Sequence, residues 1–437
     1  MSAGCSPASD EPVIVVGSGP AGATAARRLA LAGVPVRLLD RAPAFPRNKP
    51  CGGGISARAT RRFPYLAAAL PRIATHSVAR LHLEGPEGES TVIESAGPAA
   101  LMVRRVEFDA LLVELAVEAG AELVLGVDIV RATDRDGTVT LTARDGRQFR
   151  SAVVVAADGV HSTIARRLGL TRGWPPAAVA LDMMEETPRA ALRDLDPSTL
   201  WVAYGYGAAA DGRRARSAPE GYAYVFPKRD HVNIGIGYVL QYYRDHVDAA
   251  PYDLQRGFVE RLRMRGVVAG ESVRGNFTPF LIPVGGPLRR PGSGGVLLAG
   301  DAGGFVNAFT AEGIYYAMVS GDLAARTIVD AGRRPRPIGL VSAYAKACDR
   351  EIGAELRDSV LIQRHLFGDR SRIRAVIEGA HREAAITRMI LEFAVGSLSY
   401  RQLRRRLLAR APGLAARLAW ELVRKKTWPR ARAAAIF

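Results

Sequence analysis

The sequence feature that most constrains the fold of this chain is a glycine pattern close to its N-terminus. Residues 17–22 read GSGPAG, and they follow a short β-branched run, VIVV, at residues 13–16. An Ala-rich stretch of helical character continues to about Ala32, and a second apolar run, residues 36–39, ends at Asp40. A strand, a GxGxxG turn, a helix, a second strand and an acid in this order predict a βαβ unit that binds a dinucleotide.

The residues of this pattern have distinct physical tasks. Gly17 permits the tight turn, Gly19 lets the backbone approach a pyrophosphate, and Gly22 lets the helix pack on its strand. The start of the helix offers free N–H groups and a positive partial charge to an anion. A carboxylate at Asp40 accepts hydrogen bonds from a ribose hydroxyl and repels a 2′-phosphate, which favours FAD or NAD over NADP. The predicted cofactor contacts at this end are Gly17, Gly19, Pro20, Ala21, Gly22, Asp40 and Arg41.

Length and composition indicate a soluble globular protein of roughly two or three domains. Of the 437 residues, 48% are hydrophobic, and the three cysteines, Cys5, Cys51 and Cys348, are far apart in the sequence. They offer no disulfide framework and no ligand set for an iron–sulfur cluster or another metal, and they fit a reducing cytoplasm. The first twelve residues lack a signal-peptide pattern, and no run of about 18 uncharged apolar residues predicts a membrane span.

The formal net charge of +17 is concentrated at one end of the chain. Residues 401–437 hold eleven Arg or Lys residues and a single acid, Glu421, with leucines recurring at four-residue spacing. This pattern predicts helices that lie on an anionic membrane surface. A helical cap packed on the protein surface, or an oligomer contact, explains the same pattern equally well.

The remaining segments predict an α/β fold. It has a Rossmann-like cofactor domain, an inserted antiparallel β-sheet substrate domain and a helical C-terminal region. Strands are expected at residues 78–84, 90–94, 123–131, 139–144, 148–156 and 296–298, and helices at residues 106–119 and from about 311. The expected cofactor domain comprises residues 13–75, 101–170 and 274–335, the substrate domain residues 76–100 and 171–273, and the helical region residues 336–437.

Two later turns resemble each other and extend the cofactor site. A buried strand ends at Asp158-Gly159, and another ends at Gly300-Asp301 before residues 310–313, TAEG, and a helix. Asp301 is placed to accept hydrogen bonds from sugar hydroxyls of a cofactor, and backbone N–H groups near residues 312–313 are placed to face an electron-rich flavin edge. Arg105, just before a predicted helix, is placed to reach a phosphate.

Between these motifs lies a segment in which three glycines follow a cysteine. Residues 49–56 read KPCGGGIS, one βαβ unit after the glycine fingerprint. Glycines allow backbone to approach a flat ligand, and a thiol beside such a loop is a candidate for proton or redox chemistry.

The order of these motifs resembles the FAD-binding fold of the glutathione reductase class over residues 13–330. The likeness is to the branch shared by aromatic hydroxylases, halogenases and geranylgeranyl reductases. Residues 49–56 look like the cysteine-glycine motif of geranylgeranyl reductases, and residues 221–228, GYAYVFPK, resemble their YxWxFP motif. Tyr224 stands at the Trp position of that motif, and Ala308 and Ala311 stand where Pro and Gly are usual.

The resemblance implies a reductase that saturates isolated C=C bonds of a geranylgeranyl or polyprenyl chain with hydride from reduced FAD and coupled protonation. NAD(P)H or an acidic carrier such as ferredoxin is the implied transient electron donor. The implied catalytic residues are Cys51, Tyr222 and Tyr224. The further cofactor contacts are Cys51, Gly52, Gly53, Arg105, Asp158, Gly300, Asp301, Glu312, Gly313 and Ile314. The substrate contacts are Gly54, Ile55, Tyr222, Tyr224, Phe226 and Pro227.

Other functions compatible with the fold stay open. An FAD-dependent monooxygenase, either an aromatic hydroxylase or a halogenase, is the main alternative, although halogenases of this branch use a lysine in the cofactor domain and Lys49 is the only lysine before Lys228. An electron-transfer flavoprotein and a non-catalytic membrane scaffold are further alternatives. The expected location is the cytoplasm, with a peripheral position on the inner face of the membrane if residues 401–437 bind lipid.

Overall fold

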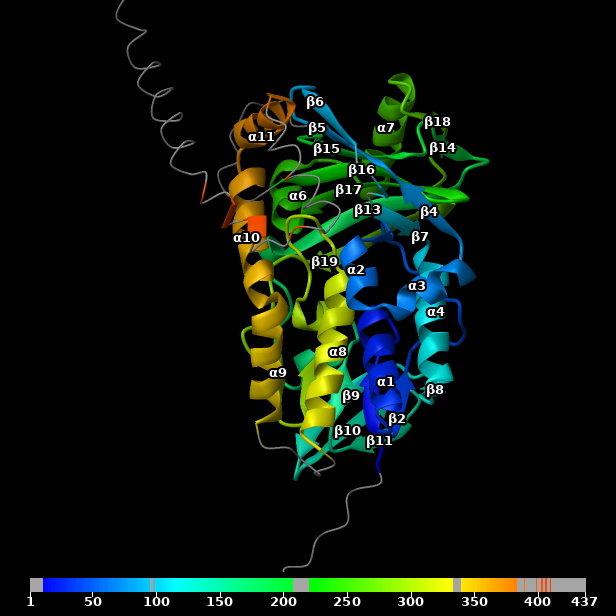
Figure 1. Ribbon diagram of the computed structural model, residues 1–437, viewed down its shortest axis with the longest axis vertical. Helices are drawn as coiled ribbons and strands as arrows, with labels where there is room; N and C mark the ends of the chain where they lie inside the picture. Colours follow the sequence, from blue (N-terminus) through cyan, green and yellow to red (C-terminus); the bar gives the residue numbers. More distant parts are fainter. Residues whose placement is uncertain are drawn as a thin grey trace, which may run out of the picture.

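The structure is a computed structural model that describes residues 11–94, 97–98, 100–206, 220–332 and 339–382, with a few isolated positions between 389 and 409. Its elements form two stacked halves, which we call the parallel half and the antiparallel half after their main sheets (Figure 1). Within these described residues, no helix has the length and apolar character needed to cross a membrane.

The parallel half is built on a six-stranded sheet whose strands come from three separate segments of the chain. Its order is β20 (Gly292–Ser293), β21 (Val296–Leu298), β12 (Val154–Ala156), β1 (Val13–Val16), β2 (Val36–Leu39) and β8 (Glu122–Val124). All neighbours are parallel except β20 and β21. The carboxyl ends of the parallel strands therefore meet at one edge, where ligands bind in sheets of this kind.

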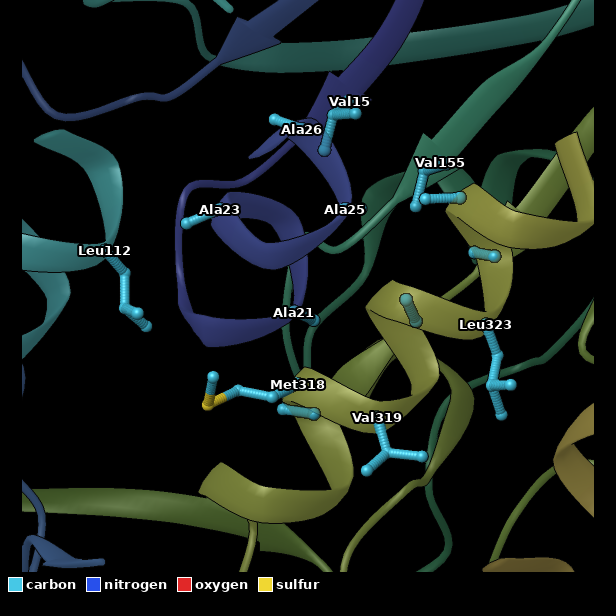
Figure 2. Close-up of a cluster of buried hydrophobic side chains, with 14 of the residues drawn as sticks. Val15, Ala21, Ala23, Ala25, Ala26, Leu112, Val155, Met318, Val319 and Leu323 are labelled. Atoms are coloured by element: carbon cyan, nitrogen blue, oxygen red, sulfur yellow. The ribbon is translucent and has the colours of Figure 1, made fainter. Parts of the chain in front are cut away.

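Small residues allow the helices of the parallel half to pack closely. Helix α1 (Pro20–Leu31) has buried alanines at positions 21, 23, 25 and 26, and Figure 2 shows Ala21 beside α8 (Ile314–Asp330). At the crossing, a Cβ atom on Gly321 would lie 2.1 Å from the carbonyl oxygen of Ala21. Helix α4 (Arg105–Glu118) packs on the other side of α1 through Leu112. A larger residue at position 321 would separate α1 from α8.

The antiparallel half is a seven-stranded sheet with one face in a core and the other toward the parallel half. Its order is β19 (Phe277–Pro283), β13 (Val179–Pro188), β17 (His231–Val239), β16 (Gly221–Pro227), β15 (Thr199–Tyr204), β5 (Arg80–Glu84) and β6 (Ser90–Glu94). Trp201, Ile234 and Ile236 pack with Phe258 of α7 (Pro251–Met264) on the core face. Alternation along the strands therefore sends the side chains between them to the opposite face.

Smaller sheets and helices complete the two halves. The strands are β3 (Gly54–Ile55), β7 (Ala100–Val103) and β4 (Thr75–Val78); β9 (Ile129–Arg135), β10 (Thr138–Ala143) and β11 (Gln148–Ser151); and β14 (Leu192–Asp194) and β18 (Val268–Gly270). The short helices are α2 (Ala57–Arg62), α3 (Tyr65–Ala69), α5 (Thr163–Arg167) and α6 (Leu240–His246). Helices α9 (Leu340–Cys348), α10 (Ala354–Phe367) and α11 (Arg370–Arg382) run along one side of both halves (Figure 1).

The predicted fold class is confirmed, but two predicted strands are each divided in the structure. Residues 123–131 form the end of β8 and the start of β9, and residues 148–156 form β11 and β12 in different sheets. At the second break the Ser151 hydroxyl bonds the backbone of Val153, which ends one ladder before the next begins. Most of residues 383–437, including the basic segment, lie outside the described residues. The domain boundaries stay a prediction.

Candidate functional site

A single large cavity lies where the carboxyl ends of the parallel strands meet the antiparallel sheet. Its volume is about 2320 Å³. The β1–α1 turn and the end of β21 form a polar part of its wall, and the antiparallel sheet with α10 and α11 forms an apolar part. Both halves of the molecule therefore contribute to one continuous site.

Backbone contacts that only glycine permits shape the polar end. Gly17 has φ +93°, and a Cβ atom there would lie 2.3 Å from the carbonyl oxygen of Ala157. A Cβ atom on Gly22 would lie 1.8 Å from the carbonyl oxygen of Gly17. No side chain caps the start of α1 at Gly19, which lines the cavity. The first N–H groups of the helix are therefore left for a bound anion.

Asp40, the predicted ribose acceptor, is fixed by the turn that it follows. One carboxylate oxygen accepts a hydrogen bond from the backbone N–H of Ser18 at 2.8 Å and another from the Ser18 hydroxyl. The other oxygen accepts the backbone N–H of Ala42 at 2.8 Å. The carboxylate lines the cavity in an orientation that these protein donors set.

A pair of arginines sharing one buried acid lies beside the helix start. Arg105 donates to Asp109 at 2.6 and 2.9 Å, and Arg47 donates to the same carboxylate at 3.1 Å. Burial disfavours the charged Arg105, but Asp109 raises its pKa above the ordinary value. Arg47 also lies 3.8 Å from Asp40. Arg47 was not among the predicted residues, and its position in an irregular loop gave no periodic signal.

Two half-buried carboxylates, Asp158 and Asp301, complete the polar end and let us ask whether its residues fit FAD. Asp158 caps α5 through the backbone N–H of Ile164 at 3.2 Å, while its second oxygen has no hydrogen-bond partner in the described part of the chain. Burial raises the pKa of Asp301, and Lys49 and Arg105 oppose that rise. An uncapped helix start, paired guanidinium groups and buried acceptors suit the phosphates and hydroxyls of a dinucleotide. The residues therefore fit FAD.

The three glycines after Cys51 form what we call the glycine arch (residues 51–54), which touches the antiparallel sheet. Lys228, almost fully buried, donates to the carbonyl oxygen of Cys51 at 2.9 Å and to Glu186. A Cβ atom on Gly52 would lie 2.8 Å from the ring of Phe226. Gly53 has φ +75°, and its Cβ would lie 2.0 Å from the carbonyl oxygen of Val103. Close contacts therefore require glycine at two of the three positions, 52 and 53.

The segment before α8 holds an alanine in a conformation that favours glycine. Ala311 has φ +55°, in the left-handed region. The next residue, Glu312, accepts a hydrogen bond from Ser56 at 3.0 Å, and burial raises its pKa while Arg58 opposes the rise. Gly313 then caps α8, and Ile314 starts it. Ala311, which stands where the family usually has Gly, is thus a strained backbone position.

An aromatic wall on β16 faces the glycine arch. Tyr224 and Phe226 stack with ring centroids 4.5 Å apart. The Tyr222 hydroxyl donates to the carbonyl oxygen of Thr310 at 2.7 Å, and the Tyr224 hydroxyl lies 3.1 Å from both carboxylate oxygens of Asp182. Period two along the strand puts all three aromatic rings on the cavity face.

The cavity brings together most of the residues that the sequence indicated. Those that line it are Gly17, Gly19, Pro20, Ala21, Asp40, Arg41, Cys51, Gly52, Gly53, Gly54, Arg105, Asp158, Tyr222, Tyr224, Phe226, Gly300, Asp301, Glu312, Gly313 and Ile314. Gly22, Ile55 and Pro227 do not line it. Ile55 and Pro227 follow cavity-facing residues on their strands, so alternation turns them away, and Gly22 packs under the turn instead.

Lys49 and Asp182 are further charged residues of the wall that were not predicted as site residues. The Lys49 ammonium lies 2.9 Å from the centroid of the Phe280 ring, and burial together with Arg105 lowers its pKa to about 8. Burial raises the pKa of Asp182 to about 7, although Tyr224 and Lys49 act in the opposite direction. An acid inside a strand of hydrophobic character, LDMM, was the one sequence signal for Asp182.

Comparison with known proteins gives the same type of fold and cofactor. Residues 10–225 match the FAD binding domain family. Digeranylgeranylglycerophospholipid reductase 2 of Methanothermobacter thermautotrophicus is 29% identical over 82% of this chain and 88% of its own length. Digeranylgeranylglycerophospholipid reductase 1 of Methanopyrus kandleri is 32% identical over 73% and 80%, respectively. The menaquinone reductase of Mycolicibacterium smegmatis is 32% identical over 73% and 76%.

Solved structures with low sequence identity share the fold. A geranylgeranyl bacteriochlorophyll reductase-like protein of Thermoplasma acidophilum superposes with a TM-score of 0.73 at 20% identity, over 91% of this chain and 98% of that chain. The halogenase PltM superposes with a TM-score of 0.62 at 17% identity, over 91% and 86%.

Proposed function

The chain belongs to the geranylgeranyl reductase family of FAD-dependent oxidoreductases, and from this premise we propose that it saturates isolated C=C bonds of a geranylgeranyl or polyprenyl chain. The observation that carries the proposal is the continuity of the cavity. One space runs from the glycine arch and the polar cofactor end to an apolar wall. An alkene within a long apolar chain could thus lie beside the cofactor while the rest of the chain stays buried.

The apolar end has the character that a prenyl chain requires. Leu81, Leu83 and Val202 of the antiparallel sheet line it on one side, and Ile373 and Ile377 of α11 line it on another. Burial of apolar surface contributes about 25 cal/mol per Å², so an isoprenoid gains much of its binding free energy from such a wall.

The proposed reaction adds a hydride to one carbon of the double bond and a proton to the other. Bound FAD, when reduced, supplies the hydride. An isolated alkene has no adjacent carbonyl to accept charge, so the protein must supply a proton to the other carbon. We propose Cys51, Tyr222 and Tyr224 as the residues at the alkene, with Cys51 as proton donor or as the group that positions the double bond.

The electron donor is proposed from the sequence and the charge. The chain has a single GxGxxG pattern, so NAD(P)H or a carrier such as ferredoxin would bind only transiently. A protein with a net charge of +17 favours encounters with an acidic carrier.

A membrane location rests on residues 401–437. These residues lie almost wholly outside the described part of the chain, so the helical prediction for them stays a prediction. We expect sedimentation with anionic liposomes that is lost when residues 401–437 are deleted. Sedimentation unaffected by the deletion would contradict a membrane role for this segment and favour a cap or an oligomer contact.

The proposed function is tested with reduced enzyme in the absence of oxygen. FAD-loaded protein is reduced with dithionite and mixed with geranylgeranyl diphosphate or digeranylgeranylglycerophospholipid. We expect products heavier by about two mass units for each saturated bond, with reoxidation of the cofactor in step. If neither lipid gives a saturated product and the cofactor stays reduced, the proposal is contradicted.

One observation favours the monooxygenase alternative. The sequence has one lysine before Lys228, which argues against halogenation, but that residue, Lys49, lines the cavity, where a halogenase would need a lysine. The two classes differ in their need for oxygen. A reductase continues to turn over without oxygen, whereas a hydroxylase or halogenase stops.

A further inference from the structure

In the antiparallel sheet beside the cavity, strand β17 has glycine at the two positions between the tyrosines of β16 and Asp182 of β13. Tyr224 of β16 pairs with Gly235 of β17, which in turn pairs with β13. One residue pair along, Gly237 lies between Tyr222 and Asp182. Residues directly opposite in a sheet point to the same face. The cavity side of β17 therefore presents glycine at both positions, so no side chain separates the tyrosines from Asp182.

The phenol ring of Tyr224 lies in the space above Gly235, where β17 has no side chain. A Cβ atom on Gly235 would lie 2.5 Å from the Tyr224 hydroxyl oxygen, so the ring lies across the glycine. Its hydroxyl reaches both oxygens of Asp182 at 3.1 Å and lies 3.6 Å from the sulfur of Met184. The tyrosine thus holds the carboxyl group in place across a whole strand.

Asp182 has the surroundings of a proton donor. Its side chain is 8% exposed and lines the cavity. Tyr222 and Tyr224 face it from β16, and Lys49 faces it from the loop before the glycine arch, over the Phe280 ring of β19. Burial raises the pKa of Asp182 to about 7, against the effects of Tyr224 and Lys49. A large share of the carboxyl groups therefore keeps its proton at neutral pH.

We propose that Asp182 is the general acid that protonates the alkene, and that Tyr224 is the residue that positions it; this inference rests on the proposed function. The π electron pair of the C=C bond takes the Asp182 proton on one carbon, and the hydride from reduced FAD forms the second C–H bond on the other. The two electrons that the alkene gains would come with this hydride from bound reduced FAD, and Asp182 becomes a carboxylate. Tyr224 and Lys49 stabilise that carboxylate until water reprotonates it. Cys51 then has a positioning role.

The first test compares Asp182→Asn with the wild type and with Cys51→Ala in a single turnover. Asn keeps the shape and an acceptor for Tyr224 but has no acidic proton. We expect saturation at least about 100-fold slower in Asp182→Asn, with FAD content and reduction by dithionite unchanged, and a smaller loss in Cys51→Ala. In the wild type the rate falls as pH rises through about 7, and Asp182→Asn lacks this pH dependence. Saturation by Asp182→Asn at the wild-type rate would overturn the inference.

A second measurement does not depend on turnover. Infrared difference spectra between about pH 5 and pH 9 should show a protonated carboxyl band that titrates in the wild type and is missing from Asp182→Asn. If wild-type protein saturates no alkene, the proposed function fails, while this spectrum still reports whether Asp182 holds a proton. If no carboxyl band is specific to Asp182, the inference fails whether or not the enzyme is a reductase.

A matched pair of glycines tests the role of Tyr224. Gly235→Ala places a methyl group against the phenol, whereas a Cβ atom on Gly237 finds its nearest neighbour, the carbonyl oxygen of Tyr222, at 3.7 Å. We expect Gly235→Ala to slow saturation at least about tenfold and Gly237→Ala to slow it less. Should Gly235→Ala fail to fold, Tyr224→Phe gives the same answer. Loss of the hydrogen bond from the Tyr224 hydroxyl raises the pKa of Asp182, so the fall of the saturation rate with rising pH moves to higher pH. An unchanged pH dependence in Tyr224→Phe would contradict the positioning role of Tyr224.

Discussion

The two halves of this molecule build their parts of the cavity in different ways. The parallel half presents backbone: Gly17 and Gly22 allow chain segments to touch where any side chain would collide. The antiparallel half presents side chains, and Tyr224 meets Asp182 only because the strand between them has glycine at position 235. The part built from backbone is specified by residues that are consecutive in the sequence. The part built from side chains depends on which strands are neighbours in the sheet.

The sharpest test of this difference is Gly17→Ala. Its Cβ atom would lie 2.3 Å from a carbonyl oxygen, in addition to the cost of a left-handed alanine. Gly33 also has positive φ, +71°, but a Cβ atom there meets nothing within 4 Å. We expect Gly33→Ala to lower the free energy of unfolding by about 1–2 kcal/mol and Gly17→Ala by about 3 kcal/mol or more, with loss of bound FAD. Thermal unfolding and the FAD absorbance of purified protein measure both.

Equal losses in the two variants would show that backbone conformation alone, and not close contact, determines the turn. The comparison between the halves would then lose its main support.

An effect of similar size that depends on pH is expected at Asp182. The folded protein holds this proton up to a pKa of about 7, against 3.8 for the ordinary carboxyl group. The unfolded chain therefore releases its proton first as pH rises, so the wild type loses stability between these values. Asp182→Asn removes the titration. Relative to the wild type, it should gain a few kcal/mol between about pH 4 and pH 7. Melting temperatures across this range check the sign, and a pH-independent difference would contradict it.

This contrast explains what the sequence could predict. The glycine fingerprint, Asp158, Asp301 and the arch are short local patterns, and the structure gathers them around one cavity. The roles of Asp182 and Lys49 become apparent only when β13 lies one strand away from β16, across β17, with the arch loop beside them, and no local pattern specifies this arrangement. The same limit applies to Ile55 and Pro227, which were predicted as substrate contacts and follow cavity-facing residues on their strands but do not line the cavity.

Lys228 illustrates the limit in another way. It is 1% exposed, because Glu186 and the carbonyl oxygen of Cys51 satisfy its ammonium group. From sequence, a lysine in the segment FPKRD is expected to be a solvated turn residue. Its partners are 42 and 177 residues away in the chain, so only the tertiary fold reveals the pair.

The contact between the halves gives a prediction of intermediate size. Gly52→Ala places a methyl group 2.8 Å from the Phe226 ring, whereas a Cβ atom on Gly54 has its nearest contact, Met102, at 3.8 Å. We expect Gly52→Ala to lower the free energy of unfolding by about 1–3 kcal/mol and Gly54→Ala by less than about 1 kcal/mol. Chemical denaturation of the two variants makes the comparison. A smaller loss in Gly52→Ala than in Gly54→Ala would mean that the arch yields more easily than the sheet contact implies.

The smallest expected effect concerns Ala311, a position in the cavity wall where the backbone adopts a conformation that alanine disfavours. Ala311 has φ +55°, and glycine adopts this conformation without a steric penalty. Glycine also makes the unfolded chain more flexible, which offsets part of the gain. We expect Ala311→Gly to raise the free energy of unfolding by about 0.5–1 kcal/mol, while Ala343→Gly, on the exposed side of α9, lowers it by about the same amount. If both variants lower it equally, the left-handed position is not strained, and the backbone before α8 is set by its contacts alone.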